Sequence, residues 1–368
     1  MKLLRNIVSP LPAVGLLLLQ LSCGGGGEPS GPGHTATALA ANSSTTIPAP
    51  PGTAVLELPS VVVRDENGAP LAGAPVTFAV TSGGGSVTGA SATTNASGIA
   101  TVGSWTIGSA STVNTLTATT GSLAAVVFTG CATEAHALDS PVSGQLALTD
   151  CPLSDGSFTD FYTITIPATG TYVFDQASPA FDTYLALFST SDVVIGVNDD
   201  FGDVGATDSR VTAIVPAGTY IISANSFSAN MVGSYSLAST ARSAPVTNCE
   251  DVFVLPGITS AQSLESTDCN TTPATPTTGF FYDDYVVFLN AGQSITVGVS
   301  SSTLDSYVEL RPAGSATVLA SNDDIDASTK NARITFTVPN FAQNSGFYII
   351  TAASPVAGTL GDYSITVQ

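Results

Sequence analysis

Short runs in which apolar and polar residues alternate fill the chain beyond about residue 35. In the run from Pro75 to Thr81, Val76, Phe78 and Val80 fall on one face and the intervening Thr and Ala side chains on the other, as in a half-buried strand. Gly, Pro, Asn and Asp separate such runs, and no long segment has the 3.6-residue period of an amphipathic helix. The pattern predicts an all-β protein built from antiparallel β-sandwiches.

The first 22 residues have the features of an export signal. Lys2 and Arg5 give a positive start, and an apolar run follows from Ile7 to Leu21. This run contains prolines and is shorter than the roughly 20 residues that span a bilayer. Residues 1–22 are therefore predicted to be a signal peptide and not a membrane-spanning helix.

A lipid anchor is predicted directly after this signal. Leu21-Ser22-Cys23 resembles the lipobox of bacterial lipoproteins, and the resemblance implies cleavage before Cys23 and lipid attachment to that residue. The family prefers Leu where this chain has Gln20, so ordinary signal cleavage remains the alternative. Residues 23–34 are rich in Gly and read as a flexible tether between the anchor and the first domain.

Residues 35–130 carry the pattern of one sandwich domain. The segments VVVRDENGAPLAGAPVTFAVTSGGGSVTG and TTNASGIATVGSWTIG alternate in strand fashion around Gly-rich turns. They resemble the bacterial immunoglobulin-like repeat of the invasin and intimin type. The resemblance implies an immunoglobulin-like sandwich used outside the cell as a spacer or adhesive unit.

The remainder of the chain contains an internal repeat. Two cysteine pairs with a separation of 20 residues begin the two copies, and the same order of signals follows each pair: a strand with Asp and an aromatic residue, a D-x-Y segment, an Asn-Asp-Asp turn, a hairpin ending in Tyr, and a terminal G-x-Y. We assign residues 131–242 to copy 1 and residues 243–368 to copy 2.

This order of signals resembles the bacterial pre-peptidase C-terminal domain. The resemblance implies a compact jelly-roll-like sandwich that accompanies secreted hydrolases and aids secretion or attachment to a surface or polymer. No peptidase-like sequence precedes the two copies here. The predicted architecture is thus three tandem antiparallel β-sandwiches, one immunoglobulin-like and two jelly-roll-like, after a signal peptide and a flexible tether.

The repeat also selects a cysteine pairing, because each copy carries its own pair at the same separation. We predict Cys131–Cys151 and Cys249–Cys269 disulfides, which suit an exported protein. The spacing does not match the C-x2-C pattern of thiolate zinc sites.

The Asn-Asp-Asp turns hold the densest groups of oxygen ligands. Calcium prefers several hard oxygen ligands, and carboxylates close together on a turn are able to converge on one ion. The alternative is ordinary turn chemistry, in which Asn and Asp bond to nearby backbone and Arg210 or Arg333 neutralises the acids. The candidate calcium ligands are Asp182, Asn198, Asp199, Asp200 and Asp203 in copy 1, and Asp305, Asn322, Asp323, Asp324 and Asp326 in copy 2.

Composition argues against catalysis and against nucleic-acid binding. With 8 Lys and Arg against 28 Asp and Glu, the net charge is -20, which repels phosphate backbones. The sequence has neither G-x-S-x-G nor H-E-x-x-H. Its two histidines, His34 and His136, are predicted to lie in the tether and on the surface of copy 1. We therefore expect no enzyme activity, no nucleic-acid partner and no small-molecule substrate.

These features predict a non-catalytic protein exported to the cell envelope or cell surface and anchored there by lipid. Its expected role is surface display, adhesion, or binding of an extracellular polymer or protein. Two alternatives stay open: a structural or secretion-accessory protein without a specific ligand, and a targeting partner of a separately encoded hydrolase.

Overall fold

A computed structural model describes residues 34–109, 113–201, 206–243, 251–270 and 279–368. Within these ranges the chain forms β-strands and one short 3-10 helix, η1 (Ala342–Asn344), and no α-helix. The all-β prediction is confirmed. The described residues fall into two compact units, one within 34–134 and 149–156 and the other within 135–148 and 157–368.

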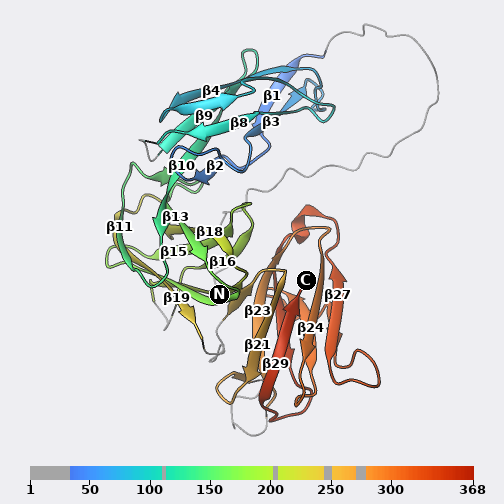
Figure 1. Ribbon diagram of the computed structural model, residues 1–368. Coiled ribbons are helices and arrows are strands. Elements are labelled where there is room, and N and C mark those ends of the chain that lie inside the picture. Colours follow the sequence, from blue (N-terminus) through green and yellow to red (C-terminus); the bar gives the residue numbers. More distant parts are fainter. Residues whose placement is uncertain (1–33, 110–112, 202–205, 244–250, 271–278) are drawn as a thin grey trace, which may run out of the picture. The chain divides into compact units, whose positions relative to one another are not determined.

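The first unit contains the predicted sandwich (Figure 1). Its strands are β1 (Ala36–Ala41), β2 (Thr46–Ala49), β3 (Ser60–Asp65), β4 (Pro75–Ser82), β5 (Gly85–Thr88), β6 (Ser91–Thr93), β7 (Ile99–Thr101), β8 (Ser104–Ile107), β9 (Val113–Thr119) and β10 (Val126–His136), together with the short β12 (Cys151–Pro152). β1, β3 and β7 form one sheet, β10, β9, β4 and β6 lie in a second, and β5 pairs with β8.

One apolar core joins these sheets. Phe78, Trp105, Leu116 and Phe128 come from four different strands, and each is 1% exposed or less. The inward alternation predicted for β4 is confirmed by Val76 and Phe78, both 1% exposed. Close packing extends to the backbone, because a Cβ atom on Gly130 would lie 2.7 Å from Cη2 of Trp105.

The second unit contains both sequence repeats. Repeat 1 is formed by β11 (Val142–Leu146), β13 (Phe158–Ile166), β14 (Gly170–Ala177), β15 (Thr183–Ser189), β16 (Val194–Asn198), β17 (Ser209–Val215), β18 (Gly218–Ser226) and β19 (Gly233–Arg242). Repeat 2 is formed by β21 (Ile258–Leu264), β22 (Cys269–Asn270), β23 (Phe281–Leu289), β24 (Ser294–Ser300), β25 (Tyr307–Pro312), β26 (Ala320–Asn322), β27 (Ala332–Thr337), β28 (Gly346–Ala353) and β29 (Gly361–Val367).

The repeats have the same strand order. In repeat 1 one layer runs β11-β19-β14-β17 and the other β16-β15-β18-β13; in repeat 2 the corresponding layers run β21-β29-β24-β27 and β26-β25-β28-β23. Figure 1 shows the layer of β21, β29, β24 and β27 side by side. The duplication read from the sequence is therefore present strand for strand.

A short strand between the repeats, β20 (Val252–Val254), joins one layer of repeat 1 and one layer of repeat 2 into a single sheet. β20 pairs in parallel with β17 of repeat 1 and with β23 of repeat 2. Phe253 packs edge-on against Phe347 with ring centroids 5.9 Å apart, and a Cβ on Gly196 would lie 2.6 Å from the Phe253 ring. Val252 and Val254 enter the core of repeat 2, as does Ile214 from β17.

Each repeat contains a buried relay of two tyrosines and one aspartate. In repeat 1, the Tyr162 and Tyr235 hydroxyls are 2.7 Å apart, and Tyr235 donates to Asp160 at 2.7 Å. In repeat 2, Tyr285 and Tyr363 are 2.5 Å apart, and Tyr363 donates to the carboxylate of Asp283 at 2.5 Å. These contacts satisfy hydroxyls that would otherwise be costly to bury. They also make Asp283 the counterpart of Asp160.

The carboxyl of Asp283 should make stability depend on pH. Burial raises its pKa to about 8, and burial also raises the pKa of Asp268 to about 6. An unfolded chain would lose these protons near pH 4, so the folded state holds more protons between about pH 4 and pH 8. The free energy of unfolding is therefore expected to fall as pH rises through this window.

Asp283→Asn should flatten this decline, chiefly above pH 6, because the amide keeps a hydrogen-bond acceptor for Tyr363 and carries no titrating proton. Urea denaturation between pH 5 and pH 8.5 measures the slope. Asp362→Asn, at an exposed position of β29, is the matched control and should retain it. A slope above pH 6 that is equal in both variants would contradict the assignment to Asp283.

Candidate functional site

The two Asn-Asp-Asp turns have the same hydrogen bonds. Asn198 ends β16 and Asn322 ends β26; the Nδ2 of each donates to the carbonyl oxygen two residues further on, at 3.2 Å and 2.8 Å. The Oδ1 atoms accept the backbone N–H of Arg210 and Arg333, both at 2.9 Å. Each asparagine thus ties the turn to the next strand of the chain, which is the turn chemistry that the sequence offers as an alternative to calcium.

The aspartates of these turns do not form a compact cluster. Among the described residues, no three of their carboxylates come within 4.8 Å of one another; Asp203 lies outside the described residues. Asp326 accepts the backbone N–H and the hydroxyl of Ser328, and these bonds lower its pKa. Burial and then the neighbouring charge of Asp200 raise the pKa of Asp199. Calcium binding by these turns stays a prediction.

The basic residues near the turns take other partners. Arg210 pairs with Asp175 on β14, with 2.5 Å between Nε and Oδ1, and its guanidinium lies 4.0 Å from the centre of the Phe201 ring. Asp305 pairs with Lys330 at 3.2 Å. Asp182 and Asp305 precede strands β15 and β25 and are both half-buried.

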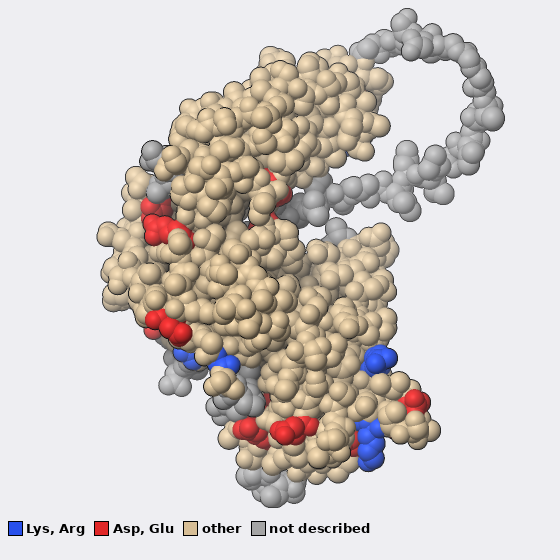
Figure 2. Space-filling model, viewed as in Figure 1, with Lys and Arg blue, Asp and Glu red and all other residues tan. Residues whose placement is uncertain are grey.

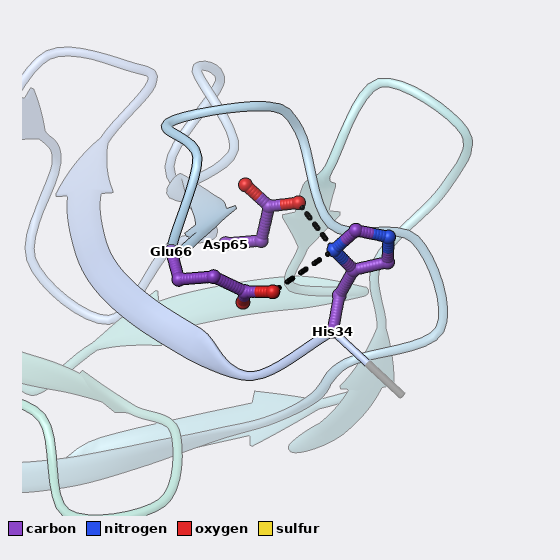
Figure 3. Close-up of side chains that lie close together, drawn as sticks. All are labelled: His34, Asp65 and Glu66. Carbon is purple, nitrogen blue, oxygen red and sulfur yellow. Dashed lines mark ion pairs between the residues drawn. The ribbon is translucent and has the colours of Figure 1, made fainter. Parts of the chain in front are cut away.

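A group of titratable side chains that the sequence did not indicate lies at the start of the first unit (Figure 3). Nδ1 of His34 lies 2.8 Å from Asp65 and 3.2 Å from Glu66, and this is the one set of three potential metal-ligating side chains within 4.8 Å in the described ranges. Asp65 also accepts the N–H groups of Asn67 and Ala69, and Glu66 accepts that of Thr35. The group closes the start of β1 onto the turn after β3, so His34 belongs to the folded unit and not to the tether.

The cysteine predictions are met where the structure describes them. Cys131 and Cys151 form a disulfide with 5.8 Å between their Cα atoms. Cys269 is disulfide-bonded; its predicted partner, Cys249, lies outside the described residues, as does the predicted lipidation site, Cys23.

The predicted surface position of His136 is wrong. His136 ends β10 and is 5% exposed; its Nε2 lies 2.9 Å from the Ser239 hydroxyl, and its ring meets Tyr162 edge-on at 6.0 Å. Burial lowers its pKa, so the neutral form is favoured. The sequence did not predict this burial, because His136 lies just before a turn, where polar residues are usually exposed. His136 therefore packs inside repeat 1, against Tyr162 and the Ser239 hydroxyl.

A surface on repeat 2 is a further candidate site that sequence reasoning missed. The outer side of β21-β29-β24-β27 presents hydroxyls in cross-strand pairs: Thr259 with Thr366 at 3.2 Å, Thr296 with Thr335 at 3.1 Å, and Ser294 with Thr337 at 2.8 Å. We call these six residues the hydroxyl face. A depression of about 290 Å³ lies beside Thr296, Gly298 and Arg333 on this face.

Repeat 1 does not present an equivalent surface. The residues of β17 that correspond to Thr335 and Thr337 are Thr212 and Ile214, which are 1% and 0% exposed. Ile214 is part of the core of repeat 2. The signal available in the sequence was the difference between Ile214 and Thr337, which is apolar in one copy and hydroxyl-bearing in the other at the same place in the repeat.

Charged side chains are sparse on the face of the molecule shown in Figure 2, where acidic groups are small and separated. The two repeats nevertheless carry most of the charge: residues 131–242 contain twelve acidic and two basic residues, and residues 243–368 twelve acidic and three basic ones. No helix in the described ranges is long and apolar enough to cross a membrane.

No protein-family model and no curated protein matches this sequence. Among solved structures, the pre-peptidase C-terminal domain of a Bacillus anthracis collagenase is 15% identical, with a TM-score of 0.23 over 29% of this chain and 93% of that domain. The Yersinia pseudotuberculosis adhesin InvE is 16% identical, with a TM-score of 0.21 over 56% of this chain and 55% of that one. Invasin, a bacterial integrin-binding protein, is 17% identical, with a TM-score of 0.22 over 90% and 57%. At these values the likenesses assign the chain to no family.

Replacing Asn322 by Ala should destabilise the second turn. The variant loses the bond to the Asp324 carbonyl and leaves the Arg333 N–H without its acceptor, which together should cost about 1 to 2 kcal/mol of unfolding free energy. Asn322→Asp is the matched control, since it keeps the acceptor for Arg333 and should lose less. Urea denaturation measures both; an Ala variant as stable as the unmodified protein would show that the turn does not depend on this side chain.

Proposed function

We propose that this protein is a non-catalytic binding protein of the cell envelope, exported and lipid-anchored at Cys23, that contacts an extracellular polymer or protein through the hydroxyl face of repeat 2. The observation that carries the proposal is the difference between the repeats: the same layer is covered at β17 in repeat 1 and open at β27 in repeat 2. The core of repeat 2 lies on the other side of this layer, so folding alone does not account for the exposed and uncharged hydroxyl face.

The chemistry of the face suits neutral or weakly charged ligands. Threonine and serine hydroxyls both donate and accept hydrogen bonds, and they carry no charge that would add to the net charge of -20. Their cross-strand bonds fix the side chains before any ligand arrives, which lowers the entropy lost on binding. The hydroxyls lie on neighbouring strands about 5 Å apart, a spacing that allows several contacts with one extended ligand.

A binding screen of the mature protein against immobilised glycans and matrix proteins tests this role. Thr335→Lys and Thr366→Lys should each weaken saturable binding by about tenfold or more, because a long charged side chain disrupts a face that depends on flat contact. Thr77→Lys, at an exposed position of β4 in the first unit, makes the same change elsewhere and should bind normally. Silence across the whole screen would favour the structural or secretion-accessory alternative, and co-purification with a hydrolase would favour the targeting alternative.

Calcium is a second, structural proposal for the acidic turns. Its support is the electrostatics of the first turn, where burial and the charge of Asp200 both disfavour ionised Asp199, so a bound cation would relieve an unfavourable charge. Millimolar calcium should therefore raise the Tm of the mature protein by a few degrees relative to chelator, and Asp199→Asn should reduce the effect. A Tm that is the same in calcium, magnesium and chelator would contradict calcium binding by these turns.

A further inference from the structure

Corresponding positions of the two repeats differ in charge at one cross-strand pair. In repeat 1, Asp175 of β14 lies opposite Arg210 of β17, and the two form an ion pair. In repeat 2, Gly298 of β24 lies opposite Arg333 of β27. Gly298 follows Asp175 by 123 residues, and Arg333 follows Arg210 by the same number. Gly298 therefore stands where the first repeat has its carboxylate.

The loss of that carboxylate leaves the arginine available. Arg333 is exposed, and in the part of the chain that the structure describes its guanidinium makes neither an ion pair nor a hydrogen bond; only its backbone N–H is bonded, to Asn322. Arg210, by contrast, is held by Asp175 and covered by Phe201. An unpaired guanidinium offers a planar set of donors that matches a carboxylate.

The loss of the side chain also leaves space. The depression of about 290 Å³ includes Thr296, Gly298, Ile325, Asn331, Arg333 and Thr366 in its lining. A Cβ atom built on Gly298 would meet only the Ala332 carbonyl oxygen, at 3.9 Å, so the backbone does not require glycine there. Glycine inside a strand often marks a place where another molecule approaches the backbone closely.

One wall of the depression is formed by Ile325, the counterpart of the Phe201 that lies over Arg210 in repeat 1. Ile325 has the place in the second turn that Phe201 has in the first, since the backbone N–H of each donates to the residue before the next strand, to Asn331 in one case and Asp208 in the other. An apolar wall beside the guanidinium lowers the local dielectric constant and strengthens its attraction for an anion. Thr296 and Asn331 add neutral hydrogen-bonding groups.

We propose that this depression binds the carboxylate of an aspartate or glutamate side chain from a partner protein, in the position that Asp175 occupies in repeat 1. The inference deepens the proposed binding role of the hydroxyl face and rests on it for its biological context. Asp323, Asp324 and Asp326 lie on the adjoining turn, all exposed, and they repel a run of acidic groups. The expected ligand therefore carries one isolated acid between neutral residues, not a polyanion.

The test uses mature protein labelled with ¹⁵N at arginine and glycine, so that the Arg333 Nε–H and the Gly298 amide report directly by NMR. The probes are an acetylated and amidated Gly-Ser-Asp-Ser-Gly peptide and its Asn counterpart, which differ in one charge. The Asp peptide should shift both resonances saturably at millimolar concentration, whereas the Asn peptide should bind about tenfold more weakly or not at all. Added salt should weaken the binding of the Asp peptide, because it screens the attraction between the two charges.

Three variants make the assignment specific. Gly298→Asp should install the internal carboxylate of repeat 1 and reduce peptide binding by about tenfold or more, as should Arg333→Gln. Asp175→Gly should create a second site, seen as new peptide-dependent shifts of the Arg210 Nε–H. A side chain at position 298 has room, since its Cβ would meet only the Ala332 carbonyl oxygen. Gly298→Asp should therefore fold normally, and its amide spectrum checks this.

Equal shifts with the Asp and Asn peptides, or binding that survives both Gly298→Asp and Arg333→Gln, would overturn the proposal. Preferential binding of oligogalacturonate over the Asp peptide would overturn it too, because it would show a uronate ligand instead of a protein side chain. These outcomes are separate from those of the polymer and matrix screen: loss of binding in Thr335→Lys with no response to the Asp peptide would leave the proposed function standing and remove only the carboxylate site.

Discussion

The parallel pairing of β20 with β17 on one side and with β23 on the other is the interaction on which the second unit depends. Each of those strands would otherwise end its layer with unpaired backbone groups, which invite association with other chains. β20 supplies partners to both and buries Val252, Phe253 and Val254 to 8% exposure or less. Three residues thereby join one layer of each sandwich into a continuous sheet.

This joint gives the two copies different surfaces. Ile214 faces the core of repeat 2, and its counterpart Thr337 faces away from that core. The buried interior has changed less, since both copies keep the relay of two tyrosines and one aspartate. Interior polar groups are constrained because losing one partner leaves the others buried without a hydrogen bond, whereas an outward position such as Asp175 or Gly298 is able to change without disturbing the core.

Sequence patterns predicted the fold class, the duplication and the Cys131–Cys151 bond because each depends on local periodicity or on spacing. The inward face of β4 followed directly from the alternation of Val76 and Phe78. β20 was not foreseen, because a three-residue apolar segment shows no period, and its role depends on two strands remote from each other in sequence. His136 was misplaced for a related reason: its burial depends on Tyr162 and Ser239, and a single polar residue before a turn does not reveal such partners.

The acidic turns show why candidate sites were harder to predict than the fold. Their composition was correctly read as rich in oxygen ligands, yet it does not determine whether Asn322 points its amide at the backbone or at an ion. The difference between Asp175 and Gly298 was visible in the aligned copies, but it gained a meaning only when register placed each opposite an arginine. Pairing across strands, not proximity in sequence, decides which charges meet.

On repeat 2, neutral hydroxyl groups and acidic side chains lie on adjoining surfaces. The hydroxyl face adds no charge, while Asp323, Asp324 and Asp326 stand on the turn beside it. If the proposed site binds a ligand, these acids would discriminate by repulsion. A neutral group would meet little repulsion, a single carboxylate would gain the attraction of Arg333, and a polyanion would meet several repulsive contacts for one attractive contact. Repulsion of this kind would confer selectivity without requiring tight binding.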